Sequence, residues 1–280
     1  MYRFKVFFKG LKFIDKLTYL YGKTIELILP ERYNKIVHLR TFINNVHSLG
    51  YDIKHHSNHL ILQSTSKAIE LRNNTSDRDV FSQVFINNEY QVIIDYVIIN
   101  QLKLNTIIDA GANIGLTALK FATFFPDSKI ICLEPDPNNY RQLQINLNGM
   151  INIACLQNAL WYKSDILALS RDFRDSREWS IHVTKPHNGD KDLVSALSIH
   201  DIIKNYNLQE IDFLKIDVEG SEAEIFKEEH NLSYLNMIKI IAIEIHDEFN
   251  CRLEIYEILK DYGFSIINSG EFTIGIKPSL

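Results

Sequence analysis

The chain has 280 residues, a formal net charge of −5 and a pI near 6.1, so it lacks the general basic field with which proteins hold nucleic acid. No apolar run in it reaches the roughly 18 residues of a transmembrane helix, and its N-terminus lacks the uninterrupted apolar segment of a secretory signal. The three cysteines, Cys132, Cys155 and Cys251, show no C-x-x-C spacing. Such a scattered, odd set is typical of a reducing compartment, so we expect a cytoplasmic protein.

Residues 1–20 combine an aromatic pattern with lysines. The apolar residues with helical spacing are Phe4, Phe7, Phe8, Leu11 and Ile14, and the lysines on another face are Lys5, Lys9, Lys12 and Lys16. A helix of this kind is typical of docking on a membrane surface or on a partner. The alternative is a helix that covers the protein's own core and leaves its lysines in solvent.

Residues 24–71 predict a small α+β region, with a helix over 34–49 and short strands over 24–29 and 59–63. The neighbouring histidines His55, His56 and His59 lack the spacing of a further metal ligand, so we interpret them as solvent-exposed residues of a hairpin. We therefore predict an N-terminal extension over residues 1–70, which is a candidate for docking or for selecting the substrate. The main domain then covers residues 71–280.

Residues 71–100 predict a polar loop followed by helices. Ser76 or Asp77 provides a helix N-cap, and an apolar helix follows Glu89 and Tyr90. Because this segment leads directly into the first strand of the main domain, we expect it to lie over the cofactor site as a lid, with Glu89 and Tyr90 as contacts. The alternative is a helix pair that only covers the domain.

Residues 106–120, TIIDAGANIGLTALK, are the stretch around which the main domain is organised. They predict a buried strand, a glycine loop and a helix whose N-terminus offers unpaired N–H groups. The loop reads D-x-G-x-x-x-G, from Asp109 through Gly111 to Gly115, whereas the dinucleotide fingerprint needs a glycine where this chain has Asn113. This spacing suits a ligand with a ribose and an amino-acid carboxylate but no phosphates, which is S-adenosylmethionine (SAM).

A second strand, over residues 129–133, ends in Glu134, which lies 25 residues after Asp109. An acid at the tip of the neighbouring strand can accept hydrogen bonds from both ribose hydroxyls. Loop and acid together predict a SAM site, and the alternative is an α/β domain that binds no ligand.

Beyond Glu134 the pattern alternates as in a doubly wound, mostly parallel sheet. The expected elements are helices over 138–146, 200–206 and 253–262, a helix that begins near Ser221, and strands over 153–157, 211–216, 238–243, 264–268 and 272–276. Residues 163–198 interrupt the alternation. Within them we predict an inserted hairpin, 165–171 against 179–185, at the rim of the site.

Four polar residues follow the later strands, namely Asp217, Glu219, Glu244 and His246. Ligands of open α/β sheets bind beyond the carboxyl ends of the strands, so we expect a methyl acceptor there. Asp217 and His246 are the best-placed general bases for a hydroxyl acceptor. The three acids could instead hold a divalent cation or cap the next helix. We expect Lys215 to point to the opposite side from Asp217.

Several of these stretches carry a family resemblance. They are Asp109-Ala-Gly-Ala-Asn-Ile-Gly115, Glu134-Pro-Asp136 with Tyr140 and Asn146, Lys215-Ile-Asp-Val-Glu-Gly220 with Glu222, and the upstream Thr75-Ser-Asp77, Phe81 and Glu89-Tyr90. Together they resemble the FkbM-type SAM-dependent methyltransferases over roughly residues 71–278. One departure is Ser198-Ile-His-Asp201, where similar proteins tend to show a Thr-Leu-Asp-Asp pattern, so the rim contacts of that helix do not carry over.

The resemblance implies a class I methyltransferase fold with a seven-stranded sheet, SAM as cofactor, and O-methylation of a small molecule or of a sugar on a glycan. By the same resemblance, Asp109, Gly111, Asn113 and Glu134 would bind SAM, and Asp217 with Glu219 would lie near the acceptor. A peripheral location at the inner membrane face would follow if residues 1–20 dock there. The alternative is a non-catalytic docking or regulatory subunit of a glycan-assembly system, which would tolerate damage to Asp109 or Glu134, and both are intact.

Overall fold

The computed structural model describes residues 30–56, 58–65, 67–171 and 177–278. The predictions for residues 1–20 and for a strand at 24–29 lie outside these residues. The chain divides into two compact units, one up to Asn87 and one from Asn88, and each is described by itself. Of the helices that the described residues form, none has the length and apolarity to span a membrane.

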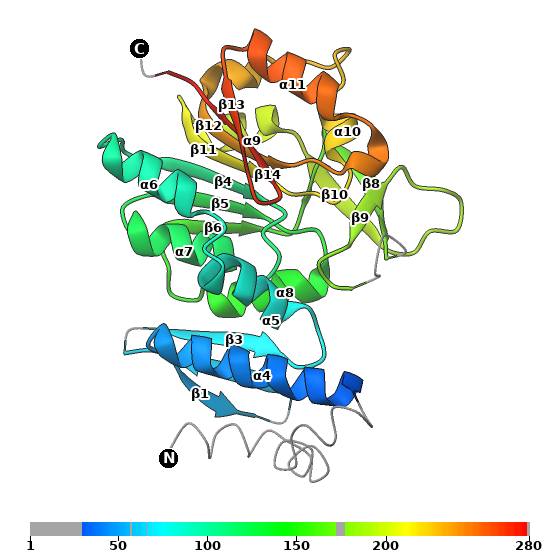
Figure 1. Ribbon diagram of the computed structural model, residues 1–280. Coiled ribbons are helices and arrows are strands. Elements are labelled where there is room, and N and C mark those ends of the chain that lie inside the picture. The colour runs from blue at the N-terminus through cyan, green and yellow to red at the C-terminus, as the bar shows by residue number, and fades with distance from the viewer. Residues whose placement is uncertain (1–29, 57, 66, 172–176, 279–280) are drawn as a thin grey trace. The chain divides into compact units, whose positions relative to one another are not determined.

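The first unit contains one long helix and a three-stranded antiparallel sheet (Figure 1). Helix α4 spans Pro30–Ser48, and strands β1 (Asp52–His55), β2 (His59–Gln63) and β3 (Ala68–Arg72) pair in the order β1-β2-β3. The predicted helix and the predicted strand at 59–63 are confirmed. Alternate residues of β2 and β3 are buried, as the two-residue period of a half-buried sheet requires.

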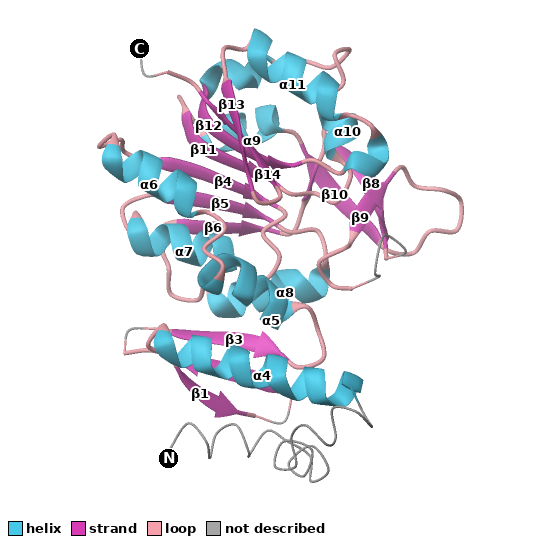
Figure 2. Ribbon diagram, viewed as in Figure 1, coloured by secondary structure: helices cyan, strands magenta, loops and turns pink. Residues whose placement is uncertain are grey.

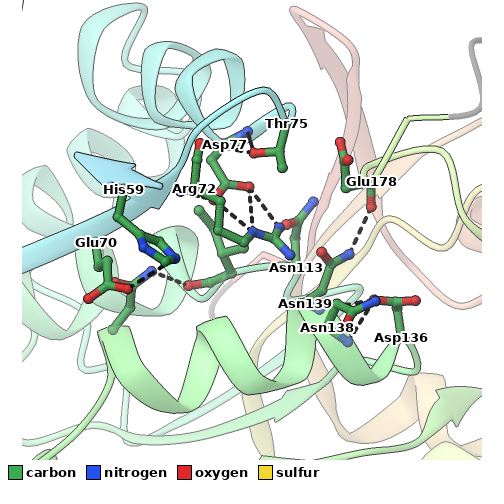
Figure 3. A network of polar contacts seen from close by, with 12 residues as sticks. His59, Glu70, Arg72, Thr75, Asp77, Asn113, Asp136, Asn138, Asn139 and Glu178 are labelled. Atoms are coloured by element: carbon green, nitrogen blue, oxygen red, sulfur yellow. Dashed lines mark hydrogen bonds and ion pairs between the residues drawn. The ribbon is translucent and has the colours of Figure 1, made fainter. Parts of the chain in front are cut away.

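The first unit ends in α5 (Asp77–Phe81) and a turn of π-helix, Ser82–Ile86. Asp77 is fully buried and accepts hydrogen bonds from the Arg72 backbone N–H at 2.7 Å and from its guanidinium Nη2 at 2.7 Å (Figure 3).

Of the three neighbouring histidines, His59 pairs with an acid: its Nε2 lies 3.4 Å from a carboxylate oxygen of Glu70. Within the part of the chain that the structure describes, no group of three or more His, Cys, Asp or Glu side chains could hold a metal ion.

The second unit is built on a seven-stranded sheet in the order β13-β14-β12-β11-β4-β5-β6 (Figure 2). Its strands are β4 (Thr106–Ala110), β5 (Lys129–Leu133), β6 (Ile153–Leu156), β11 (Ile211–Ile216), β12 (Ile238–Glu244), β13 (Ser265–Ser269) and β14 (Phe272–Ile276). β14 is antiparallel to both of its neighbours, and the other pairs are parallel. The predicted mostly parallel sheet of seven strands is thus confirmed. The strand order reverses between β4 and β11, which makes their carboxyl ends the expected ligand site.

Helices cover both faces of this sheet (Figure 1). On one face lie α6 (Gln91–Ile99), α7 (Leu116–Phe124) and α8 (Pro137–Asn146), and on the other lie α9 (Ile199–Tyr206), α10 (Glu222–Ile225) and α11 (Arg252–Asp261), with short 3-10 turns at Ser233–Met237 and Asp247–Phe249. The Phe121 ring of α7 stacks on Phe213 of β11 with centroids 4.8 Å apart, whereas Leu214 joins the core with Ile255 of α11. Alternate residues of β11 therefore face opposite helix layers.

The inserted segment folds as a small sheet of its own. It consists of β7 (Ala159–Leu160), β8 (Asp165–Ser170), β9 (His182–Thr184) and β10 (Leu193–Leu197) in the order β7-β10-β8-β9. The predicted pairing of 165–171 with 179–185 is confirmed as β8 against β9. Strand β10 was not predicted, because its partners β7 and β8 are distant in the sequence and its own five residues carry little local signal.

Candidate active site

The loop after β4 turns tightly because three of its residues have left-handed backbones. Gly111, Asn113 and Gly115 have φ of +79°, +49° and +83°, and the buried Asn146 amide donates to a loop carbonyl at 2.9 Å. A Cβ on Gly111 would lie 1.7 Å from the carbonyl oxygen of Asp217. Glycine is thus required here because the backbone leaving β11 passes against the loop.

Glu134 ends β5 beside this loop and is 5% exposed. Its carboxylate accepts hydrogen bonds from the backbone N–H groups of Asn113 at 2.8 Å and of Asp136 at 2.9 Å. Burial raises the pKa of Glu134 to about 7, against the opposing effect of these hydrogen bonds. One oxygen accepts each bond, so lone pairs remain for further donors.

Asp136 links the inserted segment to this corner of the sheet. It caps α8 by accepting from the backbone N–H groups of Asn138 at 2.9 Å and Asn139 at 3.0 Å (Figure 3). The Arg171 guanidinium also bonds to it, at 2.5 Å. The Asn139 amide donates to the carbonyl of Glu178 at 2.8 Å. The residues on either side of 172–176 are therefore anchored at the N-terminus of α8.

Asp109 and Asp217 meet at one buried ammonium. Lys215 Nζ lies 3.3 Å from Asp109, 3.2 Å from Asp217, and donates to the Gly111 carbonyl at 2.7 Å. The expectation that Lys215 points away from Asp217 is wrong, because residues two apart on a strand share a face and the ladder continues through the bond from the Asp217 N–H to the Ala110 carbonyl at 3.1 Å. Burial disfavours the charged ammonium, yet the two carboxylates hold the pKa of Lys215 well above its ordinary value.

Three glutamates that follow β11 or end β12 surround a buried imidazole. His246 Nδ1 lies 2.5 Å from Glu222, and its Nε2 lies 3.3 Å from Glu219 and 3.6 Å from Glu244. The structure therefore brings Glu219, Glu244 and His246 together as predicted from their strand ends. Glu222 was not predicted as a site residue. Its position at a helix start favours a capping role, and only its place in the family motif singled it out.

The pKa values of this cluster are strongly shifted. Burial lowers the pKa of His246, but hydrogen bonds to Glu219 and Glu222 outweigh it and raise the value to about 10. Burial, together with the charge of Asp217, raises the pKa of Glu244 to about 9. Such shifts concentrate at functional sites.

Glu89 and Tyr90 lie in the turn before α6 and take different positions. Tyr90 is 2% exposed and packs its ring 5.7 Å from Phe121 and 5.2 Å from Phe272. Burial and the nearby Asp217 raise the pKa of Glu89 to about 7. Glu89 is therefore electrostatically coupled to the acceptor side, while Tyr90 is a core contact.

The cap alternative for the acceptor-side acids finds no support in helix α10. The N-cap position of α10 is Ser221, which follows Asp217 by four residues and Glu219 by two. Glu219 instead occupies a left-handed backbone conformation, with φ of +51°, and precedes Gly220 at φ +96°. Such a conformation is costly for a residue with a side chain.

The residues around the glycine loop fit SAM. Asn113 Oδ1 and both carboxylate oxygens of Asp109 are buried and make no hydrogen bond within the described part of the chain. The ion pair to Lys215 balances the charge of Asp109. Unsatisfied acceptors of this kind suit the ammonium and hydroxyl donors of the cofactor. Glu134 keeps acceptor capacity on the same side.

Fold and site together define a class I SAM-dependent methyltransferase. The family model of the methyltransferase FkbM domain matches residues 109–266, which contain the glycine loop, Glu134 and the acceptor-side cluster. The chain belongs to the FkbM methyltransferase family.

Individual relatives are distant. Methyltransferase sdnD from Sordaria araneosa is 27% identical over 194 residues, which cover 57% of this chain and 73% of that protein. A solved rRNA methylase from Streptococcus thermophilus is 13% identical, covers 68% of this chain and 97% of its own, and has a TM-score of 0.41. A precorrin-6y C5,15-methyltransferase from Geobacter metallireducens is 13% identical over 63% of this chain and 81% of its own, with a TM-score of 0.37.

Proposed function

We propose that the protein transfers a methyl group from SAM to a hydroxyl of a sugar, a glycan or another small molecule. The observation that carries this proposal is the position of Asp217, which ends β11 at the switch point with its carboxylate 3.2 Å from Lys215. A hydroxyl is a poor nucleophile until its proton has an acceptor, and a carboxylate at this strand end supplies one. The overall charge of −5 favours a small acceptor over nucleic acid.

The proposed cofactor-binding residues are Asp109, Gly111, Asn113, Gly115 and Glu134. When bound, SAM would supply an electrophilic methyl group, which passes to the acceptor oxygen as the thioether sulfur leaves in line, so orientation of the two reactants provides much of the rate. Glu134 would hold the ribose, and the acidic loop would balance the positive charge of the cofactor.

The proposed acceptor-side residues are Asp217, Glu219 and His246, whereas Glu89 and Tyr90, in the turn before α6, are proposed as lid contacts of the cofactor. Asp217 would accept the hydroxyl proton, and Lys215 would keep its carboxylate aimed at the end of the sheet. Glu219 carries a charge on the same side and accepts hydrogen bonds from hydroxyl groups well. Among the described residues no group of three or more acids, histidines or cysteines is placed to hold a metal ion, so the metal alternative for these acids has no support in the structure.

The test is methyl transfer from labelled SAM to a panel of nucleotide sugars, glycans and small polyols, with product mapping by mass spectrometry. We expect label on an oxygen of at least one hydroxylated acceptor. Label found on nitrogen or carbon would contradict O-methylation. SAM binding without turnover on every acceptor would favour the non-catalytic alternative, which the intact Asp109 and Glu134 make less attractive.

We further propose a cytoplasmic protein that docks on an anionic membrane surface or on a partner through residues 1–20. The support is the sequence pattern of phenylalanines and lysines in that stretch. Residues 1–70 would then contribute to the choice of acceptor.

A further inference from the structure

We infer that Glu222 is a positioning residue for the acceptor side of the site. Its carboxylate binds Nδ1 of His246, a contact called the clamp below, and the ring held in this way fixes the carboxyl groups of Glu219 and Glu244 near its Nε2. The inference rests on the proposed function for the importance of that side. The clamp itself is a property of the free protein, and can be measured without any substrate.

One buried carboxylate joins the loops that follow two neighbouring strands. Glu222 is 0% exposed. One of its oxygens accepts from the His246 backbone N–H at 2.8 Å and bonds to the ring Nδ1 at 2.5 Å, and the other accepts from the Gly220 N–H at 2.9 Å. Gly220 follows β11 and His246 follows β12. Because both oxygens must accept at once, an amide at this position cannot replace the carboxylate.

The clamp leaves only one ring nitrogen for the site. With Nδ1 bonded to Glu222, Nε2 faces Glu219 at 3.3 Å and Glu244 at 3.6 Å. The ring is itself 0% exposed, so it acts on an acceptor only through these two carboxylates. The positive φ of Glu219 indicates that its side chain is held in a costly backbone geometry.

Charge balance favours a protonated ring. Glu219 and Glu222 flank one imidazole, and a neutral ring would leave their carboxylates to repel one another across a buried cluster, whereas the raised pKa of Glu244 lets its carboxyl carry a proton of its own. A further acid, Asp247, is next in sequence but pairs with Arg252 at 2.6 Å and lies in solvent. The pKa of His246, raised to about 10, supports the same conclusion. An imidazolium at neutral pH cannot take a proton from the acceptor, so this inference gives His246 a positioning role and leaves proton acceptance to a carboxylate.

The decisive experiment follows the ring nitrogens of His246 by long-range ¹H–¹⁵N NMR on the free protein between pH 5.5 and 10. The chain has ten histidines, and the variant His246→Gln identifies the signal. We expect both nitrogens to remain protonated at pH 7.5. Titration with an ordinary midpoint near 6.5 overturns the inference, and does so whatever any variant shows.

Two variants then test the clamp. Glu222→Gln should lower the titration midpoint by at least one pH unit, and Glu219→Gln should lower it by less, since the Nδ1 bond remains. The matched control is Glu224→Gln, on the same short helix but paired with Lys227 near the surface, which should leave the midpoint in place. If Glu222→Gln does not fold, the wild-type titration and Glu219→Gln still decide; an unchanged midpoint in Glu219→Gln overturns the inference.

Activity measurements connect the clamp to methyl transfer. With SAM and an acceptor from the panel above, Glu222→Gln should lower kcat at least tenfold while the affinity for SAM measured by calorimetry changes less than twofold, and Glu224→Gln should change neither. Equal kcat in Glu222→Gln and Glu224→Gln contradicts the positioning role. If no hydroxyl is methylated yet the ring stays protonated and responds to Glu222→Gln, the clamp is supported and the proposed function is what fails.

Discussion

Lys215 and Asp217 point to the same side of β11, and the Lys215 ammonium lies 3.2 Å from the Asp217 carboxylate. The same ammonium lies 3.3 Å from Asp109 on β4. One buried cation therefore joins an acid of β4 to the acid that follows β11, across the point where the strand order reverses.

The first prediction concerns this cation. Lys215→Met removes the positive charge but keeps most of the volume, and leaves Asp109, 1% exposed, without its ion-pair partner. Breaking a buried pair in this way typically costs about 3–5 kcal/mol of unfolding free energy. Urea denaturation should register a loss of that size. Lys163→Met is the control, because the Lys163–Asp165 pair is solvent-exposed and such pairs contribute little to stability. Equal losses in the two variants would contradict the role of Lys215.

The second prediction separates backbone strain from lack of space. Gly111 and Gly149 have almost the same φ, +79° and +81°, but a Cβ on Gly149 meets nothing within 4 Å whereas one on Gly111 would strike the Asp217 carbonyl. Gly149→Ala should cost about 1–2 kcal/mol from the left-handed backbone alone. Gly111→Ala should cost about 1–3 kcal/mol more, because the exit of β11 must move. Thermal unfolding of both variants measures the difference, and similar melting temperatures would refute the close approach.

Features set by local sequence could be predicted, whereas contacts between distant segments could not. The strands of the main sheet were predictable because runs such as residues 129–133 and 211–216 are apolar and end in polar residues, a local pattern. The glycine loop and Glu134 were found by spacing, which is also local. The role of Glu222 was not, since its partners His246 and Gly220 come together only when β11 and β12 pair. The orientation of Lys215 follows from a local rule, since residues two apart on a strand share a face and the ladder of β11 continues to Asp217.

The third prediction is a pH dependence of cofactor affinity. The pKa of Glu134 is raised from 4.5 to about 7, so in the free protein its carboxyl is largely protonated at pH 6 and largely ionised at pH 8. The ionised form accepts hydrogen bonds from ribose hydroxyls better. SAM affinity should therefore rise from pH 6 to pH 8. Binding should also release protons, and calorimetry in buffers of different ionisation enthalpy measures that release.

The variants sharpen this prediction. Glu134→Ala removes two charge-assisted hydrogen bonds of about 1.5–3 kcal/mol each, so affinity should fall at least tenfold at pH 8. Glu134→Gln should bind SAM weakly, and its affinity for SAM should lose most of the pH dependence. Glu254→Gln, on the exposed side of α11, should retain both. Unchanged SAM affinity in Glu134→Ala would show that Glu134 does not bind the cofactor.

The fourth prediction concerns residues 1–20. Each lysine near anionic lipid adds about 1 kcal/mol, so Lys5, Lys9, Lys12 and Lys16 together should give salt-sensitive binding to anionic vesicles. Deleting residues 1–20 should abolish co-sedimentation and leave SAM affinity unchanged. Absence of co-sedimentation of the full chain at low salt would leave a partner, or the protein's own core, as the contact of this stretch.

The last prediction concerns Asp217. Asp217→Asn keeps the shape of the side chain but removes the proton acceptor, and loss of a general base typically lowers the rate 10²–10⁴-fold. SAM affinity should change little, because Lys215 keeps its contacts with Asp109 and the Gly111 carbonyl, and the melting temperature should stay near that of the wild type. Asp165→Asn at the start of β8 is the surface control. Sensitivity of the wild type to EDTA would assign Asp217 to a metal instead of to the proton. Turnover within threefold of wild type would mean that its carboxylate only holds Lys215 in place, and the proton acceptor would then be sought at Glu89, whose pKa is raised to about 7 by burial and by the charge of Asp217.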